Sequence, residues 1–294
     1  MAPATAGSVA FRGFQTWYEV HHTADPDRRT PLLVLHGGPG HAHNALRPLR
    51  GLVATGRDVV FYDQLGCGRS DRPDDPSLWT IELFHQELHA VRDQLGLDRV
   101  VLLGHSWGGM LALEHLLRGA DGVRAVVLAS APASVPLWIE ETQRLRAGLP
   151  PDVDRTLRRH EQAGTTDDPA YLEAVEVFYA RHVCRVQPKP QVLIDSEEAT
   201  GTQVYETMVG ASEITTTGVL RTWDIRDQLG RIDVPTLLTH GAHDEFTPRQ
   251  AQVVAEGIPG CRRVLFPASS HSAHLEETEA YLATVGAFLA EVRV

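Results

Sequence analysis

The sequence contains little cysteine, and the few cysteines form no pattern. Cys67, Cys184 and Cys261 are far apart, odd in number and match no metal-binding or redox spacing. This excludes a disulfide framework as the basis of the fold, and we expect a reduced, cytoplasmic protein. Lysine is rarer still, because Lys189 is the only lysine among 27 basic residues, which we attribute to coding bias.

The sequence also lacks the segments that direct a chain to a membrane. Residues 1–7 have neither the basic start nor the apolar stretch of a signal peptide, so no leader is expected. No apolar run approaches the ~20 residues of a transmembrane helix. The net charge of −11 disfavours nucleic acids and anionic membranes as partners. The oligomeric state stays open, and a monomer is compatible with these features.

Short apolar runs alternate with helical patterns along most of the chain. Strands are expected at 11–20 (one or two edge strands), 32–35, 58–63, 100–103, 123–129, 235–241 and 262–266. Helices are expected at 44–53, 80–95, 110–117, 249–256 and 276–292. Glycine-rich turns follow several of the strands. The alternation predicts an α/β fold with a mostly parallel, doubly wound sheet.

The alternation stops near residue 132, where prolines begin to divide a series of short helical segments. These segments are expected at 137–147, 153–163, 169–182 and 203–209, with no buried strand among them. We therefore predict a core formed by residues 1–131 and 221–294, and an inserted helical cap formed by residues 132–220. Most aromatic residues of the cap are expected to pack inside it, and a minority to face a substrate pocket.

A serine lies between one predicted strand and the following helix, in Gly104-His105-Ser106-Trp107-Gly108. A strand, a serine flanked by glycines and then a helix form the context of a nucleophile elbow. The alternative is a buried structural turn. We predict that Ser106 is a nucleophile that carries out acyl chemistry on an ester, thioester or amide.

A serine nucleophile needs a base, and the base needs an orienting acid. His271 follows the last predicted strand, and Asp244 follows the strand before it, so both are expected at the same sheet edge as Ser106. His274 is the rival base, but we expect it to face solvent at a helix start. Asp233 precedes its strand and belongs at the opposite edge. The chain order of serine, acid and histidine matches the α/β-hydrolases.

An acyl-transfer site also needs two backbone donors for the oxyanion. One is predicted to be the amide of Trp107, directly after the nucleophile. The other is expected in the glycine-rich loop 36–40, from Gly38, with Gly37 as the second choice. A simple tight turn is the alternative for this loop.

The histidines away from the predicted triad suggest no metal centre. His240 and His243 are three residues apart, but no third ligand is apparent. We therefore expect neither a metal nor an organic cofactor.

Several motifs together resemble the proline iminopeptidases, serine peptidases of the α/β-hydrolase fold. The matching stretches are HGGPG at 36–40, YDQLGCGRS at 62–70, GHSWGG at 104–109, GAHDEFTP at 241–248, and Ser270-His271 with Glu276 and Tyr281. The resemblance continues through the cap at 206–213 and 220–224. That segment looks most similar to the branch that contains the tricorn-interacting aminopeptidase and the L-amino-acid amidases.

The resemblance implies a serine hydrolase that releases an N-terminal residue, proline or another often apolar residue, through an acyl-enzyme. Its substrates would be short peptides, amino-acid amides or arylamides. It also implies that Glu213 of the cap and Glu245 beside the catalytic acid bind the substrate amine. A helix-capping Glu213 and a solvated Glu245 are the structural alternatives.

Two other functions remain open from the sequence. One is an esterase, an acyltransferase or a tailoring hydrolase acting on a peptide-like natural product without a free amine. The other is a non-catalytic binding protein built on a hydrolase fold.

Overall fold

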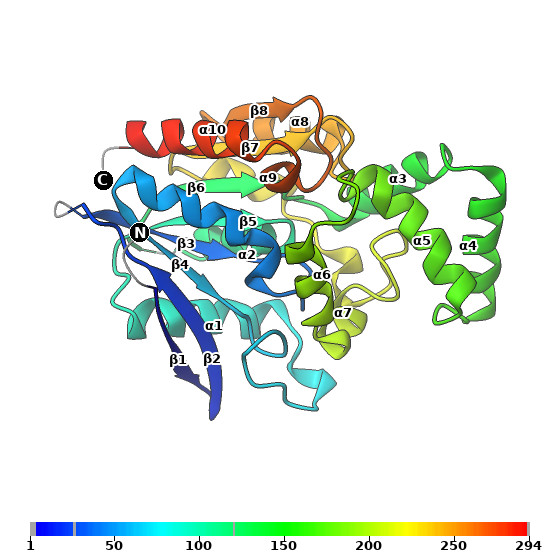
Figure 1. Ribbon diagram of the computed structural model, residues 1–294, viewed down its shortest axis with the longest axis horizontal. Helices are drawn as coiled ribbons and strands as arrows, with labels where there is room; N and C mark the ends of the chain where they lie inside the picture. Colours follow the sequence, from blue (N-terminus) through cyan, green and yellow to red (C-terminus); the bar gives the residue numbers. More distant parts are fainter. Residues whose placement is uncertain (1–3, 26–27, 120, 293–294) are drawn as a thin grey trace.

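An eight-stranded sheet forms the centre of the protein (Figure 1), in a computed structural model that describes residues 4–25, 28–119 and 121–292. The strand order is β1-β2-β4-β3-β5-β6-β7-β8, and all neighbours from β4 to β8 are parallel. Only β1 and β2 run antiparallel to their neighbours. The strands are β1 (Thr5–Phe11), β2 (Phe14–His21), β3 (Arg29–Leu35), β4 (Arg57–Tyr62), β5 (Val100–His105), β6 (Val123–Ala129), β7 (Thr236–Gly241) and β8 (Arg262–Phe266). The predicted mostly parallel sheet is confirmed.

Helices cover both faces of this sheet, because its central strands are apolar on both sides. Leu33 and Leu102 belong to the core on one face, and their neighbours Leu32 and Val101 belong to the core on the other. The first face is covered by α1 (Ile81–Gln94), α2 (Trp107–Leu117) and α8 (Pro248–Gly257). The second is covered by η1 (His43–Thr55), α9 (Ala273–Glu276) and α10 (Thr278–Glu291).

Two of the predicted elements differ in detail from the structure. The helix expected at 44–53 is a 3-10 helix, η1, which contains Pro48. Proline lacks the amide hydrogen that a regular α-helix needs at this position. The N-terminal edge strand begins earlier than expected, because β1 and β2 form a hairpin from Thr5 onward. A short 3-10 helix, η2 (Pro76–Leu78), precedes α1.

The chain between β6 and β7 is helical, and within this described stretch no strand joins the sheet. It contains α3 (Val135–Arg146), α4 (Pro151–Ala163), α5 (Pro169–His182), α6 (Gln191–Glu198), α7 (Thr202–Met208), η3 (Val219–Thr222) and η4 (Arg226–Arg231). Figure 1 shows α3, α4 and α5 beyond one end of the strands, with α6 and α7 closer to the sheet. A small apolar cluster lies inside this region, including Leu157, Tyr171 and Phe178. The predicted cap, 132–220, falls within this stretch.

The three cysteines are free thiols, and Cys67 and Cys184 are buried. Burial raises the pKa of the Cys67 thiol well above its ordinary value, which disfavours the reactive thiolate. None of the helices in the described ranges combines the length and the apolar character needed to cross a bilayer.

Candidate active site

Ser106 lies in a sharp turn between β5 and α2, with φ of 53° and ψ of −121°. The turn requires glycine on both sides of the serine. A Cβ on Gly104 would lie 2.3 Å from the carbonyl oxygen of Gly108, and a Cβ on Gly108 would lie 2.1 Å from the carbonyl oxygen of Leu35. Real atoms cannot approach so closely, so the elbow depends on these two residues. The geometry explains why the motif has glycine at both positions.

Asp244 and His271 emerge at the same sheet edge, after β7 and β8. Nδ1 of His271 lies 2.7 Å from Oδ1 of Asp244, and both side chains are buried. Asp244 also accepts hydrogen bonds from the Phe246 amide at 2.7 Å and from Ser130 Oγ at 2.6 Å. These donors fix the carboxylate, and the carboxylate orients the imidazole. Ser106 and His271 line one cavity, so the structure brings the three predicted residues together.

Ser130, which follows β6 directly, was not predicted from the sequence as a site residue. Its φ of 51° turns the chain at the strand end, and its hydroxyl reaches both Asp244 and the carbonyl oxygen of His271, at 3.3 Å. The one available signal was its position after a buried strand, where side chains reach the carboxyl edge of the sheet.

Burial and neighbouring charge act in opposite directions on His271. Burial by itself lowers its pKa. The charge of Asp244 and the hydrogen bond from His271 to it, followed by the charges of Glu213 and Glu276, outweigh burial and raise the pKa above the ordinary value. The site therefore favours the imidazolium that a general base becomes after it accepts a proton.

The prediction that His274 faces solvent is wrong. Its side chain is buried, and its Nε2 atom lies 3.1 Å from the carbonyl oxygen of Ala45. Burial lowers the pKa of His274 to about 4. The reason is that α9 packs against η1 and covers this ring. Asp233 is exposed ahead of β7, at the opposite end of that strand from Asp244.

The glycine-rich loop 36–40 passes directly beside the serine. A Cβ on Gly37 would lie 3.3 Å from Cβ of Ser106, and Gly38 has a φ of 111° that favours glycine. Gly38, Trp107 and Ser106 line one small cavity of about 40 Å³. The indole of Trp107 donates to Gln64 Oε1 at 2.8 Å, which anchors the start of α2.

Glu245 is fully buried beside Glu213. Its carboxyl oxygens have no hydrogen-bond partner among the described residues. Burial raises the pKa of Glu245 well above its usual range, and the neighbouring Glu213 raises it further. The alternative of a solvated Glu245 is therefore wrong. Glu213 lies in the loop between α7 and η3 and caps neither helix. Burial, followed by the charges of Glu213 and Glu245, also raises the pKa of Tyr179.

Two cavities meet at Ser106, and Glu213 lines both of them. The larger one, about 270 Å³, runs between Ser106 and helices α5 to α7, past Tyr179 and Tyr205 to Glu176 and Glu197. The smaller one is apolar and is lined by Trp107, Met110, Val135, Trp138, Val209 and Leu220. Ser106 therefore lies between a larger cavity, which Glu176, Glu197 and Glu213 help to line, and a small apolar one.

The end of α5 is hydrogen-bonded to the loops after β7 and β8, which carry Asp244 and His271. The carbonyl oxygen of His182 accepts hydrogen bonds from the amides of Glu245, at 3.2 Å, and His271, at 3.1 Å. The His182 ring also lies 2.8 Å from the carbonyl oxygen of His243 through Nδ1. The sequence analysis missed this contact, because a backbone carbonyl carries no residue-type signal.

Comparison with known proteins places this architecture in a class. Residues 30–278 match the alpha/beta hydrolase fold family, so the protein is an α/β hydrolase. The proline iminopeptidase of Saccharolobus solfataricus is 40% identical, over 95% of this chain and 90% of the relative. The proline iminopeptidase of Levilactobacillus brevis is 41% identical, over 96% of this chain and 95% of the relative.

Solved structures agree with these relatives. The crystal structure of VinJ has a TM-score of 0.94 and 41% identity, with 99% of each chain covered. The crystal structure of the proline iminopeptidase of Mycobacterium smegmatis has a TM-score of 0.91 and 41% identity, covering 98% of this chain and 99% of that one. The chain belongs to the proline iminopeptidase family, which confirms the resemblance carried by its motifs.

Proposed function

We propose that this protein is a serine aminopeptidase that releases the N-terminal residue of short peptides, amino-acid amides or arylamides. One observation carries the proposal: Glu213, which is partly buried and lines the cavity that holds Ser106 and His271, lies beside the fully buried carboxyl group of Glu245. A substrate ammonium brings the positive charge that this pair lacks. Membership of the proline iminopeptidase family supports an aminopeptidase.

The chemistry would follow an acyl-enzyme route. Ser106 attacks the scissile carbonyl, and His271 accepts the hydroxyl proton. Asp244 orients the imidazole through the 2.7 Å contact at Nδ1 and stabilises the imidazolium. His271 then protonates the leaving amine, whose departure leaves the acyl group on Ser106. Water, deprotonated by His271, attacks this ester and releases the amino acid. The route requires no metal and no organic cofactor.

The amides of Gly38 and Trp107 are the proposed donors to the tetrahedral oxyanion. Both residues line the small cavity with Ser106, and Trp107 begins α2, where backbone amides are free of helical partners. The donors act where negative charge develops, so they stabilise the transition state more than the substrate.

The two cavities suggest how a substrate is oriented. The side chain of the N-terminal residue would enter the small apolar cavity, whose volume of about 40 Å³ favours a small apolar group. The leaving part would occupy the larger cavity of about 270 Å³. Because Glu213 lines both, it lies where the free amine of such a substrate would be held.

A panel of aminoacyl arylamides with matched N-acetylated controls tests the proposal. We expect the wild type to hydrolyse the free-amine substrates at least tenfold faster than the acetylated ones. Glu245→Gln and Glu213→Gln should remove most of this preference, because an amide cannot neutralise the ammonium. Glu197→Gln, at the outer part of the larger cavity, is the matched control and should retain it.

Equal rates on free and blocked substrates would contradict the amine-binding role. That result would favour an esterase or a tailoring hydrolase acting on a substrate without a free amine. A wild type that neither hydrolyses any member of the panel nor reacts with a fluorophosphonate at Ser106 would instead indicate a binding protein on a hydrolase fold.

A further inference from the structure

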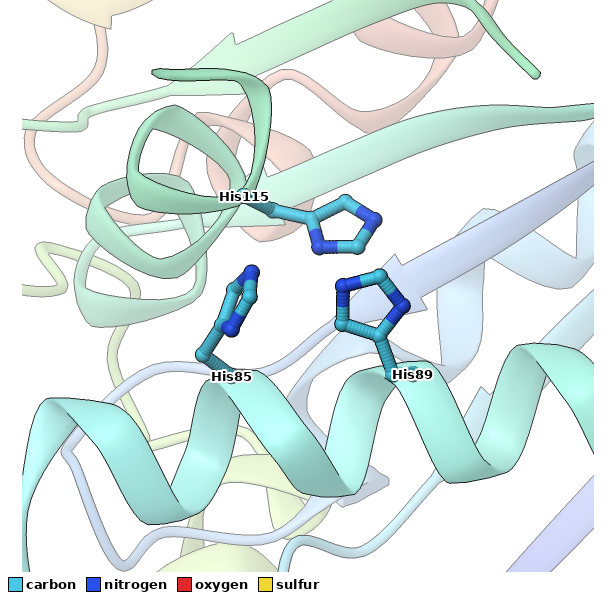
Figure 2. Close-up of side chains that lie close together, drawn as sticks. All are labelled: His85, His89 and His115. Atoms are coloured by element: carbon cyan, nitrogen blue, oxygen red, sulfur yellow. The ribbon is translucent and has the colours of Figure 1, made fainter. Parts of the chain in front are cut away.

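Three histidines gather between α1 and α2, away from the active site. His85 and His89 lie on the same face of α1, one turn apart, and His115 reaches them from α2 (Figure 2). The ring centroids are 4.7 Å apart for His85 and His89, 4.7 Å for His89 and His115, and 5.2 Å for His85 and His115. One nitrogen of each ring lies within 4.8 Å of the other two.

Two of these rings have buried nitrogens without a partner. Nδ1 of His115, on a side chain with 0% exposure, and Nε2 of His85, with 8%, make no hydrogen bond to any described residue. A buried polar atom without a partner is costly, so such atoms usually mark a missing ligand or water. A neutral imidazole nitrogen of this kind can donate its lone pair to a metal ion.

The surroundings contain more negative than positive charge. Arg118, the cation near His85, forms ion pairs with both Glu82 and Glu114. Arg92 lies near three carboxylates, Asp93, Asp98 and Asp121. This excess of carboxylates offsets part of the cost of placing a divalent cation beside two arginines.

We propose that His85, His89 and His115 form a binding site for a divalent first-row transition ion such as Zn²⁺, which links α1 to α2. Neutral imidazoles suit zinc, copper and nickel, and histidines four apart on a helix act as a bidentate pair. Zinc binds imidazole nitrogen at about 2.0–2.1 Å, so the nitrogens must move closer together. The exposed His89 has the freedom to do so.

This site differs from the histidine pair considered in the sequence analysis. Nε2 of His240 accepts a hydrogen bond from Arg263, so that ring is already engaged.

The proposed metal site is also separate from the candidate active site. His115 and Ser106 lie near opposite ends of α2, about 13 Å apart along the helix axis. A bound ion would thus brace the helix that begins at the nucleophile.

The hydrogen bond from Arg92 to His115 must change before His115 can bind a metal ion as the third ligand. The Arg92 guanidinium donates to Nε2 of His115 at 2.8 Å, so without metal the neutral ring carries its hydrogen on Nδ1. Coordination through Nδ1 requires this hydrogen to relocate to Nε2, by exchange with solvent, and Arg92 to turn away. Arg92 keeps its other acceptors, the carbonyl oxygens of Leu97, Asp98 and Asp121. Arg92→Gln should therefore strengthen metal binding, although it removes a buried side chain.

Competition with a chromogenic chelator, on protein first stripped with a strong chelator, measures Zn²⁺ binding directly. We expect one ion per chain, and at least a tenfold loss of affinity in His89→Ala. His22→Ala, at a partly exposed histidine directly after β2, is the matched control and should bind as the wild type does. Hydrolysis by His89→Ala should be unchanged. Equal Zn²⁺ affinity in His89→Ala and His22→Ala would overturn the proposal.

Two further readouts test the three-histidine arrangement. His115→Gln offers an oxygen to Arg92 in place of Nε2, so the fold should be kept while the affinity falls at least tenfold. Zn²⁺ should raise the melting temperature of the wild type, and should not raise that of His89→Ala, because binding to the folded state stabilises it. Wild-type affinity in His115→Gln, or no Zn²⁺-dependent shift in the wild type, would contradict the link between α1 and α2.

Discussion

The sheet core and the helical cap contribute to the site by different means. In the core, backbone geometry positions the chemistry: Ser106 depends on Gly104 and Gly108, whose absent side chains let two strands and a helix meet. In the cap, hydrogen bonds from side chains to backbone carbonyl oxygens position the loop that carries Glu213. Trp138 Nε1 donates to the carbonyl oxygen of Glu213 at 3.1 Å, and Gln143 donates to that of Ile214 at 3.2 Å. The core therefore positions Ser106 through its backbone, and the cap positions Glu213 through hydrogen bonds from its side chains.

Charge is also handled differently in the two regions. The core buries Glu87 without an ion pair to any residue that the structure describes, and this side chain accepts hydrogen bonds from the Thr16 hydroxyl at 2.5 Å and the Leu65 amide at 2.8 Å. The cap buries Arg146 and pairs it with Asp154 at 2.6 Å and Glu161 at 2.9 Å. The core thus contains a buried carboxylic acid that stays protonated, whereas the cap contains a buried arginine that is neutralised by two carboxylates.

The largest expected effect comes from the core. Ser106→Ala should reduce turnover at least 10³-fold on free-amine and blocked substrates alike, because the nucleophile acts on both. Measured kcat, with circular dichroism to verify folding, checks this, and the exposed Ser77→Ala is the control. Full activity in Ser106→Ala would refute the nucleophile assignment. A cap change such as Glu213→Gln should instead distinguish the two kinds of substrate.

Two glycine-to-alanine substitutions compare how strictly the core and the cap require glycine at a backbone position. Gly108→Ala places a Cβ 2.1 Å from the Leu35 carbonyl oxygen and should destabilise the protein by about 5 kcal/mol. Gly164 follows α4 in the cap, and a Cβ added there would have no atom within 4 Å. The only obstacle to Gly164→Ala is the positive φ of 68°, which alanine disfavours. We expect a cost of about 1 kcal/mol there. Urea unfolding measures both, and similar costs would contradict the stricter geometry of the core.

These contrasts explain what could be predicted from the sequence. The elbow, Asp244 and His271 were predictable because the ends of parallel strands share an edge and because glycine marks a strained turn. The contacts of Ser130 and of the His182 carbonyl oxygen were not predictable, because no local sequence pattern marks either of them. The burial of His274 was mispredicted, because the position of a short helix such as α9 depends on tertiary packing against η1.

The buried acid of the core predicts a dependence of stability on pH. Burial raises the pKa of Glu87 to about 8 from 4.5, so the folded state holds a proton that the unfolded state loses. Its contribution is fully present below pH 4.5 and is lost as the pH rises through 8. We expect a decrease of about 4 kcal/mol across this range.

Urea unfolding between pH 5 and 8.5 measures this decrease. Glu87→Gln should flatten the curve, because the amide remains neutral throughout. The exposed Glu173→Gln, on α5 of the cap, is the control and should follow the wild type. A wild-type curve that rises over this interval, or one that Glu87→Gln leaves unchanged, would show that Glu87 is not the group responsible.

Loss of the charge network of the cap should destabilise the protein less than the changes at Gly108 and Glu87 in the core, and it should also affect the proposed amine site. Arg146 is 1% exposed, and its partner Glu161 accepts from Thr215 Oγ1 at 2.7 Å, in the loop that carries Glu213. Arg146→Met should cost about 2 kcal/mol, because the carboxylates left behind are partly solvated.

The same substitution should weaken the preference for free-amine over acetylated substrates severalfold, since the loop with Glu213 loses an anchor. Arg158→Met is the matched control: its side chain is 53% exposed, and among the described residues it forms an ion pair with Asp154 alone. It should cost less than about 1 kcal/mol and leave the preference intact. If both variants kept the wild-type preference, the charge network would stabilise the cap without positioning Glu213, and its part in substrate selection would be limited to packing.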